Sequence, residues 1–373
     1  MSANRLTIKH VWVDNKPAAD RGRRYDMATT KPQGEAVRNF ILQNIAKHPT
    51  DIAVRVSARF HITRQAVHKH MSRLIKEGLI TESGQTRNRS YRLAVLADWK
   101  QSYAIQPGLA EDVVWIKDIR PLLGSVPDNV LTLWQHGFTE MFNNAIDHSQ
   151  GAHIGVEVRR TAADTEIIIA DDGVGIFKKI RDQMGLLDER HAILELAKGK
   201  LTTAPAHHSG EGIFFTSRMF DSFDILSGGV SFAHADGDAN DWIRDNPQYR
   251  NGTAVWMQLR NHTTRTTKKV FDEYVSGEDY DFSRTVVPVV LAQHLGEPLL
   301  SRSQAKRVLA RVELFRTVVF DFSQIVAIGQ AFADEIFRVF AQAHPQIDLQ
   351  FIHANAAVRQ MITRARSPRG PVR

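Results

Sequence analysis

The chain has 373 residues, 43% of them hydrophobic and 24% charged, which is enough to build two or three soluble domains with their own cores. It contains no cysteine, and this excludes a disulfide framework and any cysteine-ligated zinc or iron–sulfur site. The N-terminus lacks the apolar run of a signal peptide, and no stretch of about 18 apolar residues is present. We therefore expect no membrane partner and a cytoplasmic location.

The charge is concentrated in the first quarter of the chain. Residues 1–100 hold 19 Lys+Arg and 8 Asp+Glu, a balance of +11, whereas the whole chain carries +7. The remaining residues are therefore net acidic. A basic segment of this kind predicts a polyanionic partner for the first quarter, although a merely soluble surface explains the charge equally well.

A basic arm at residues 1–33 precedes a segment, residues 34–95, with the pattern of three helices and a β-hairpin. Thr63 is placed to cap the third helix, because its hydroxyl can accept a free backbone N–H, and Gly78 suits the end of that helix. The segments LITES and SYRLAV then flank a basic tip, GQTRNR. Helical periodicity predicts the following inward-facing residues: Val37, Phe40, Ile41, Ile45, Val67, Met71 and Leu74.

This order of elements resembles the winged helix-turn-helix family, most specifically over ITRQAVHKHMSRLIKEGLI. In that family the third helix enters the major groove of DNA and the wing contacts the backbone or minor groove. The resemblance therefore implies DNA as a partner, and a homodimer, because such regulators often bind as dimers. A protein-interaction module is the alternative. The implied DNA-binding residues are Arg64, Gln65, His68 and Lys69 on the third helix, and Arg87 and Arg89 at the wing tip.

After a connector at residues 96–127, four short motifs follow one another in order. They are EMFNNAIDHS at 140–149, DDGVGIF at 171–177, SGEGIFF at 209–215 and NGTAVWMQL at 251–259. Each motif is weak by itself, so their order and spacing carry the evidence. Together they resemble the GHKL ATPase family, which includes DNA gyrase B, Hsp90-type chaperones, histidine kinases and MutL-type repair proteins. The resemblance covers residues 128–262 and implies an α/β-sandwich ATPase domain of the Bergerat type that binds ATP with Mg²⁺.

The first motif indicates a helix with a polar face. Glu140, Asn144 and His148 recur every four residues, so they line one side, and the resemblance places them in the ATP site. Mg²⁺ takes few protein ligands and prefers oxygen, so the Asn144 amide oxygen with phosphate oxygens and water makes a sensible shell. Glu140, one turn away, is the candidate catalytic residue, because a carboxylate there can orient or deprotonate a water or a substrate group. A core helix with solvated polar residues is the alternative.

The second motif indicates a buried strand that runs into a turn. The resemblance implies that Asp171, at the strand's end, accepts the adenine amino group, while Asp172 is expected to be solvated. Gly173 and Gly175 are expected to let the backbone approach the base and phosphates, because glycine has no Cβ to clash.

The third and fourth motifs complete the expected ATP site. Gly210 and Gly212 open a helix whose N–H groups would face phosphate at its positive end. Phe214 stands where the histidine-kinase form has a third glycine, which weakens the case for fast turnover more than the case for binding. Thr253, on a late strand, is placed to hydrogen-bond Asp171.

Residues 198–209, KGKLTTAPAHHS, resemble the flexible lid that closes over the triphosphate in this family. The candidates for phosphate contact from this lid are Lys198, Lys200, His207 and His208. For each of them, a solvated loop residue is the simpler interpretation. A zinc site at the adjacent histidines has little support, because they lack the spacing and the third ligand that such a site needs.

Strand and helix patterns alternate over residues 280–368, which predicts a small α/β domain. The segment DFSQIVAIGQAFADEIFRVF resembles the STAS-like modules found behind kinase-like ATPases in bacteria. In STAS partners of anti-sigma-factor kinases a serine accepts phosphate, but Gln330 and Ala331 occupy that region here. Ser323 lies earlier and fits a turn. We therefore expect a docking or sensing domain for a protein partner.

Three functions fit these segments. The first is a bacterial regulator in which ATP occupancy or hydrolysis changes DNA binding. The second is a protein kinase that acts in trans on a partner, since Pro107, Pro121 and Pro127 leave no room for the acceptor hairpin of a histidine kinase. The third is a scaffold whose ATP site has decayed, although Glu140 and Asn144 are intact. Whether the chain is an enzyme therefore stays open.

Overall fold

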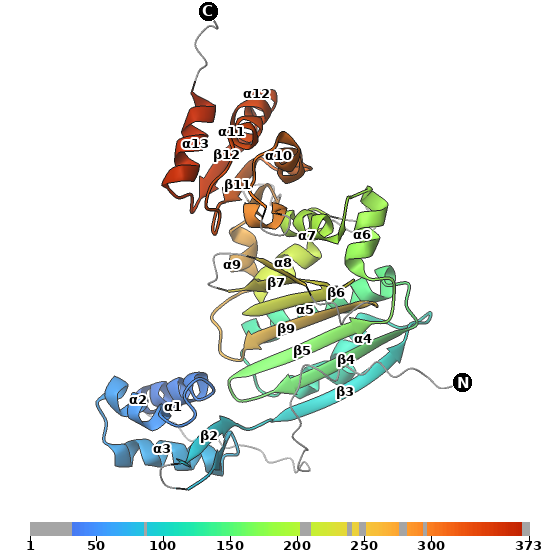
Figure 1. Cartoon of the computed structure of the whole chain (residues 1–373). Coiled ribbons are helices and arrows are strands. Elements are labelled where there is room, and N and C mark those ends of the chain that lie inside the picture. The colour runs from blue at the N-terminus through green and yellow to red at the C-terminus, as the bar shows by residue number, and fades with distance from the viewer. Residues whose placement is uncertain are drawn as a thin grey trace, which may run out of the picture.

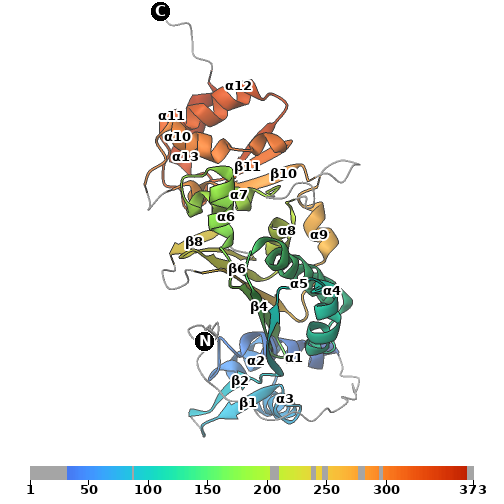
Figure 2. The same cartoon turned by 90° about the vertical axis from the view of Figure 1, so that its right-hand side faces the viewer.

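The computed structural model describes residues 32–85, 88–201, 210–236, 241–245, 251–275, 282–293 and 297–367. The chain forms three units that lie in a row, with a large sheet in the middle and a smaller unit of helices and strands at either end (Figures 1 and 2). We refer to them as the N-terminal unit (residues 32–93), the central unit (residues 97–272) and the C-terminal unit (residues 282–366).

The N-terminal unit consists of three helices and a two-stranded antiparallel hairpin. Its apolar side chains form a core separate from the rest of the molecule, and every inward-facing residue predicted from periodicity lies in it or packs against it. The Thr63 hydroxyl accepts the Ala66 N–H at 3.2 Å, so the predicted cap is confirmed. The elements are α1 (Pro32–Asn44), α2 (Ile52–Phe60), α3 (Arg64–Lys76), β1 (Ile80–Ser83) and β2 (Ser90–Leu93).

The central unit is built on an antiparallel sheet of seven strands within the described ranges, in the order β3-β4-β5-β9-β6-β7-β8. Its first strand comes from residues expected to be a connector: β3 pairs along its length with β4 and forms one edge of the sheet. The strands are β3 (Ala97–Ala104), β4 (His153–Arg160), β5 (Asp164–Asp171), β6 (Ser222–Ser227), β7 (Val230–Ala235), β8 (Trp242–Asp245) and β9 (Thr253–Arg260).

Helices cover one face of this sheet, and α5 is the longest of those described (Figure 2). The buried side of α5 packs into the core that the sheet residues share. These helices are α4 (Glu111–Val114), the π-helix η2 (Trp115–Ile119), the 3-10 helix η3 (Arg120–Leu123), α5 (Asp128–His148), α6 (Ile176–Met184), α7 (Glu189–Lys198), α8 (Gly212–Met219) and α9 (Thr267–Asp272).

The C-terminal unit alternates strands and helices, as its sequence pattern predicts. Its described strands form a parallel sheet in the order β10-β11-β12. The elements are β10 (Arg284–Pro288), η4 (Val289–Ala292), α10 (Arg302–Leu309), η5 (Val312–Leu314), β11 (Thr317–Asp321), α11 (Gln330–Asp334), the π-helix η6 (Glu335–Phe340), α12 (Ala341–Ala343), β12 (Asp348–Ile352) and α13 (Ala356–Arg366).

The central unit is joined differently to its two neighbours. Three residues separate β2 from β3, the Leu96 N–H donates to the Arg160 carbonyl at 2.7 Å, and Ala162 packs against the N-terminal core. Toward the C-terminal unit, by contrast, a single hydrophobic core runs through both units without a break. The contact on the N-terminal side is therefore narrow, and the contact on the C-terminal side is broad.

Candidate functional site

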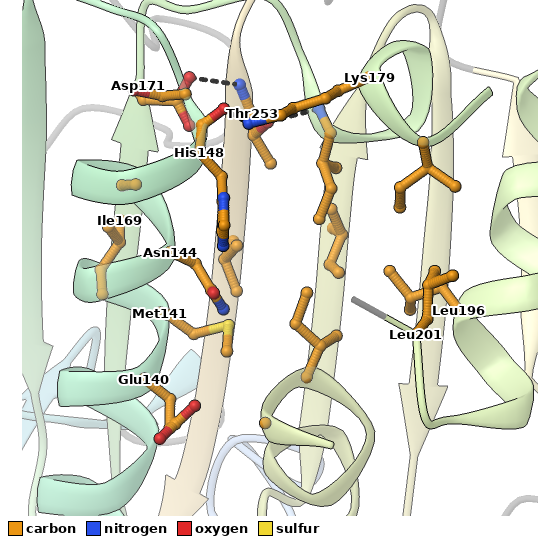
Figure 3. A pocket seen from close by; sticks show the side chains of 18 of the residues that line it. Glu140, Met141, Asn144, His148, Ile169, Asp171, Lys179, Leu196, Leu201 and Thr253 are labelled. Atoms are coloured by element: carbon orange, nitrogen blue, oxygen red, sulfur yellow. Dashed lines mark hydrogen bonds between the residues drawn. The ribbon is translucent and has the colours of Figure 1, made fainter. Parts of the chain in front are cut away.

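A cavity of about 330 Å³ lies in the central unit between α5, the sheet and helices α6, α7 and α8. This volume is at the lower end of the range for small-molecule pockets. Glu140, Asn144 and His148 project from α5 toward it, at the four-residue spacing expected from the sequence (Figure 3). Its other lining residues are Met141, Ala145, Ser149, Ile169, Asp171, Ile176, Lys179, Ile180, Leu196, Leu201, Gly210, Gly212, Ile213, Phe214, Ile225, Thr253 and Val255.

Asp171 supplies a buried carboxylate at one end of the cavity (Figure 3). Its Oδ1 atom accepts the N–H of Gly173 at 2.9 Å and the N–H of Thr253 at 3.3 Å. Burial raises the pKa of Asp171 to about 6, because the charged form loses hydration, while the two amide donors act in the opposite direction. Thr253 interacts with Asp171 through both its backbone N–H and its hydroxyl, and the hydroxyl also accepts the N–H of Ile176 at 3.0 Å.

Three glycines near Asp171 allow close backbone packing. A Cβ on Gly173 would lie 2.0 Å from the Ser149 carbonyl oxygen, and one on Gly175 would lie 2.6 Å from the Ser227 Oγ. Gly252, which the motif also contains, has φ +72°, and its Cβ would lie 1.9 Å from the Asp171 carbonyl oxygen. Gly173 and Gly175 were expected to let the backbone approach a ligand, and the structure adds that neighbouring protein atoms leave no room for a Cβ at either position.

Glu140 and the start of α8 form the other end of the cavity. Gly212 is the first residue of α8, and a Cβ there would lie 2.1 Å from the Glu140 Oε2. Glycine therefore lets the Glu140 carboxylate lie directly against the helix N-terminus, where free N–H groups favour negative charge. Gly210, with φ +75°, precedes it, and its carbonyl accepts the Leu201 N–H at 3.0 Å.

Lys179 is a cavity residue that the sequence motifs did not single out. It lies on α6, and its Nζ donates to the His148 carbonyl at 2.8 Å, at the end of α5. Partial burial lowers the pKa of Lys179, against the opposing attraction of Asp147. Lys179 lies four residues after Gly175, one helical turn into α6. This spacing is the sequence signal that could have identified Lys179 as a cavity residue.

One expectation about a charged residue was wrong. Lys198 is not a solvated lid residue, because its side chain is 1% exposed and bonded to Glu195. Asp172 was expected to be solvated, and its side chain is 28% exposed. It also links neighbouring segments: its Oδ1 accepts the N–H groups of Ala152 and His153 at 2.7 and 2.9 Å, and its Oδ2 contacts the His153 ring at 3.2 Å.

The remaining lid candidates divide between described and undescribed positions. Residues 202–209, which include His207 and His208, lie outside the described residues. Lys200 is described: its Nζ lies over the rings of Phe282 and Phe315, and it does not line the cavity. Within the described ranges, no group of three or more potential His, Asp or Glu metal ligands comes together.

Phe214 has a packing role in place of the expected third glycine. Its buried ring contacts Phe282 at 4.7 Å between centroids and Tyr274 at 5.0 Å, and the Arg218 guanidinium lies over it at 4.5 Å. Since Phe282 belongs to the C-terminal unit, Phe214 connects the cavity wall to that unit.

The N-terminal unit exposes the side chains predicted to contact DNA. Arg64, Gln65, His68 and Lys69 are all exposed on α3, at and just after its N-terminus. Arg89 is partly exposed and pairs with Glu82 at 3.5 Å, also at the surface. Arg87, the other residue expected at the tip of a wing, lies outside the described residues.

Comparison with known proteins bears on one part of the chain. Residues 304–359 match the family model of a STAS-like domain of unknown function (DUF4325). This match confirms the STAS-like domain expected in the C-terminal unit. A search of curated proteins found no match. The chain is thus a mixed α/β protein with a large antiparallel sheet and a C-terminal STAS-like domain. None of the helices in the described ranges is both long and apolar enough to cross a bilayer.

Proposed function

We propose that this chain is an ATP-binding regulator in which a nucleotide, bound with Mg²⁺ in the central cavity, changes how the N-terminal unit engages DNA. The observation that carries the proposal is that residues from all four motifs line one cavity, although they are spread between Glu140 and Thr253. In this proposal the central unit is a GHKL-type ATPase domain with a Bergerat fold, and the N-terminal unit is a winged helix.

The two ends of the cavity carry different chemical groups, one suited to the base of a nucleotide and the other to its phosphates. The buried Asp171 carboxylate is an acceptor for the exocyclic amino group of adenine. Glu140 lies about 12 Å further along α5 than His148, since eight residues at 1.5 Å each separate them. That end holds the α8 N-terminus and Gly210, where backbone N–H groups suit phosphate oxygens.

The side chains at the phosphate end fit a magnesium ion. Asn144 offers an amide oxygen toward the cavity and Glu140 a carboxylate one turn away, an oxygen set that Mg²⁺ uses together with phosphate and water ligands. Bound there, the ion would neutralise phosphate charge. Asn144 is the residue that would hold it, and Glu140 would orient a water or accept its proton.

The N-terminal unit is placed to respond to the central unit. Its wing strand β2 continues into the edge strand β3 after three residues, and the turn between β4 and β5 packs on its core through Ala162. A change in the sheet would therefore be transmitted through a short connection. Coupling requires two states whose equilibrium both ligands bias, and this junction is the candidate element.

The ATP site is tested by nucleotide binding to the full chain. Calorimetry with ATP and Mg²⁺ should show saturable binding to the wild type and more than about tenfold weaker binding to Asn144→Ala. Asn143→Ala is the matched control, because the same residue type one position earlier does not line the cavity. Equal affinity in all three proteins would refute the assignment.

Coupling to DNA is tested separately with a labelled duplex of mixed sequence. Fluorescence anisotropy at fixed, low salt should give different apparent affinities with and without ATP and Mg²⁺. The Asn144→Ala protein should give a single isotherm under both conditions. Identical wild-type isotherms with and without nucleotide would refute the coupling to DNA but would not contradict the assignment of the ATP site.

A kinase acting in trans is the alternative, and the position of Glu140 favours testing it. The Glu140 carboxylate lies against the start of α8, where phosphoryl transfer would take place. The wild type, but not Glu140→Ala, would then label a protein in cell extract from labelled ATP. Absence of such a labelled protein, with ATP binding intact, would favour the regulator.

A further inference from the structure

Helix α7 links the cavity to the C-terminal unit. Its residues from Ala192 to Lys198 are all buried, which is unusual for a helix near the surface of a small domain. Leu196 lines the cavity, whereas Glu195 and Lys198 face residues of the C-terminal unit. A single helix therefore contributes to both the cavity wall and the interdomain contact.

Lys198 is fixed by three acceptors at the end of this helix. Its Nζ donates to the Glu195 Oε1 at 2.7 Å, to the Ala310 carbonyl at 2.7 Å and to the Arg307 carbonyl at 3.1 Å. These bonds use all three donors of the ammonium group, so its charge is buried without an unsatisfied proton. Two of the acceptors belong to the C-terminal unit.

Arg311 contacts the same end of α7 through two further bonds. Its Nη1 lies 3.3 Å from the Glu195 Oε2, and its Nη2 donates to the Lys200 carbonyl. The guanidinium thus bridges the last turn of α7 and the segment that follows it. Arg311 has φ +61°, a conformation that non-glycine residues adopt infrequently, and it is held there between α10 and η5.

The chain that leaves α7 stays attached to the C-terminal unit until it reaches the cavity. The Thr285 hydroxyl donates to the Lys198 carbonyl at 2.7 Å, and a Cβ on Gly199 would lie 2.6 Å from the Phe282 ring. Two residues later Leu201 lines the cavity and donates to the Gly210 carbonyl. The residues that lead into the expected lid are therefore held against the C-terminal unit where they leave α7.

We propose that the C-terminal unit supports the wall of the nucleotide site without lining the cavity itself, and that Arg311 is a positioning residue that holds this wall at Leu196 and Leu201. The effect on nucleotide affinity rests on the proposed function, whereas the effect on the cavity wall does not. Because coupling is reciprocal, a protein that binds the C-terminal unit and shifts this contact changes nucleotide affinity, and nucleotide changes the affinity for that protein.

The test compares Arg311→Ala with Arg302→Ala in the full chain. Arg302 is a suitable control because it lies in the same unit, is 64% exposed and pairs within it, with Glu335 at 3.9 Å. Without nucleotide, Arg311→Ala should speed hydrogen exchange at residues 196–201 and 212–215. With ATP and Mg²⁺ it should weaken binding at least about fivefold, the lower limit of typical coupling. With Arg311→Lys, the hydrogen exchange rates and the nucleotide affinity should both lie between those of Arg311→Ala and the wild type. Arg302→Ala should change neither the exchange rates nor the affinity.

Thr285→Val is the milder variant if Arg311→Ala does not fold, since it removes one hydrogen bond and keeps the shape of a buried side chain. It should change both readouts in the same direction by a smaller amount. A lower unfolding midpoint with unchanged exchange and affinity would overturn the proposal, because the contact would then be merely structural. If the wild type binds no ATP, the proposed function fails, and the exchange rates still decide this inference.

Discussion

The backbone N–H of Thr253 donates to the Asp171 Oδ1 at 3.3 Å, which joins the end of β5 to the start of β9 at one end of the cavity. The carboxylate that accepts this bond is 5% exposed. A buried acidic group with a raised pKa is common at functional sites, where such a group is kept despite its cost in stability. Two predictions about Asp171 separate its role in binding from its cost to the fold.

Nucleotide binding should weaken as the pH falls through about 6. The Asp171 carboxylate is a stronger acceptor for the adenine amino group when it is ionised than when one of its oxygens carries a proton, and its pKa is raised to about 6 by burial. Adenosine is the best probe, because it has no phosphate that titrates in the same range. Its dissociation constant should rise about tenfold between pH 7.5 and pH 5. In Asp171→Asn the affinity should be weak at both pH values, and a pH dependence retained there would contradict the assignment.

The same substitution should stabilise the protein at neutral pH. The pKa of Asp171 is raised from 3.8 to about 6, so the protonated form is favoured in the folded state and ionisation destabilises the fold. The penalty is absent below pH 3.8, grows through the window up to about 6 and is at most about 3 kcal/mol above it. Asp171→Asn should therefore raise the free energy of unfolding at pH 7.5 and not at pH 4. Urea denaturation at the two pH values measures the difference, and a loss of stability at pH 7.5 would count against it.

Two glycines near the cavity should respond differently to alanine. Gly252 has φ +72° and its Cβ would meet the Asp171 backbone, so Gly252→Ala should cost about 3 kcal/mol or more. At Gly212 the obstacle is the flexible end of Glu140, and alanine also favours the helix by up to about 1 kcal/mol. Gly212→Ala should therefore fold normally but displace Glu140 and lower any ATP turnover. Thermal unfolding and a phosphate-release assay distinguish the two, and similar unfolding midpoints would contradict the prediction.

Much of the cavity could be predicted because its residues are set by local periodicity. Glu140, Asn144 and His148 lie on one face at a spacing of four, and an apolar strand ending at Asp171 fixes where that side chain emerges. The glycines were harder to interpret, because a glycine that admits a ligand and one that admits a neighbouring carbonyl have the same local sequence. At Gly173 the Ser149 carbonyl occupies the space that a Cβ would need, which is a packing reason for glycine that the sequence did not indicate.

The burial of Lys198 could not be predicted because two of its three partners are distant in the sequence. The surrounding KGKLTTAP is polar, which favours a solvated loop. Its burial depends on the carbonyls of Arg307 and Ala310, more than a hundred residues later. The strand β3 was missed for a similar reason, because its exposed edge gives a mixed burial pattern with no clear alternation.

DNA binding by the N-terminal unit should depend on Arg64 and not on Arg73, although both lie on α3. Arg64 is exposed at the start of the helix, whereas Arg73, near its end, pairs with Glu77 at 2.8 Å. With a labelled duplex of mixed sequence, Arg64→Ala should weaken binding and, if it removes a phosphate contact, lower the slope of log K against log salt by about 1. Lys69→Ala should behave in the same way, because that side chain is exposed on the same helix.

Arg73→Ala removes the same charge from the same helix, so it controls for a general loss of basic character. It should change the affinity less than about twofold and leave the salt slope unaltered, because its guanidinium is already engaged by Glu77. Equal losses in Arg64→Ala and Arg73→Ala would mean that DNA responds to net charge without a defined surface. No binding by the wild type at low salt would instead favour a protein-interaction role for the N-terminal unit.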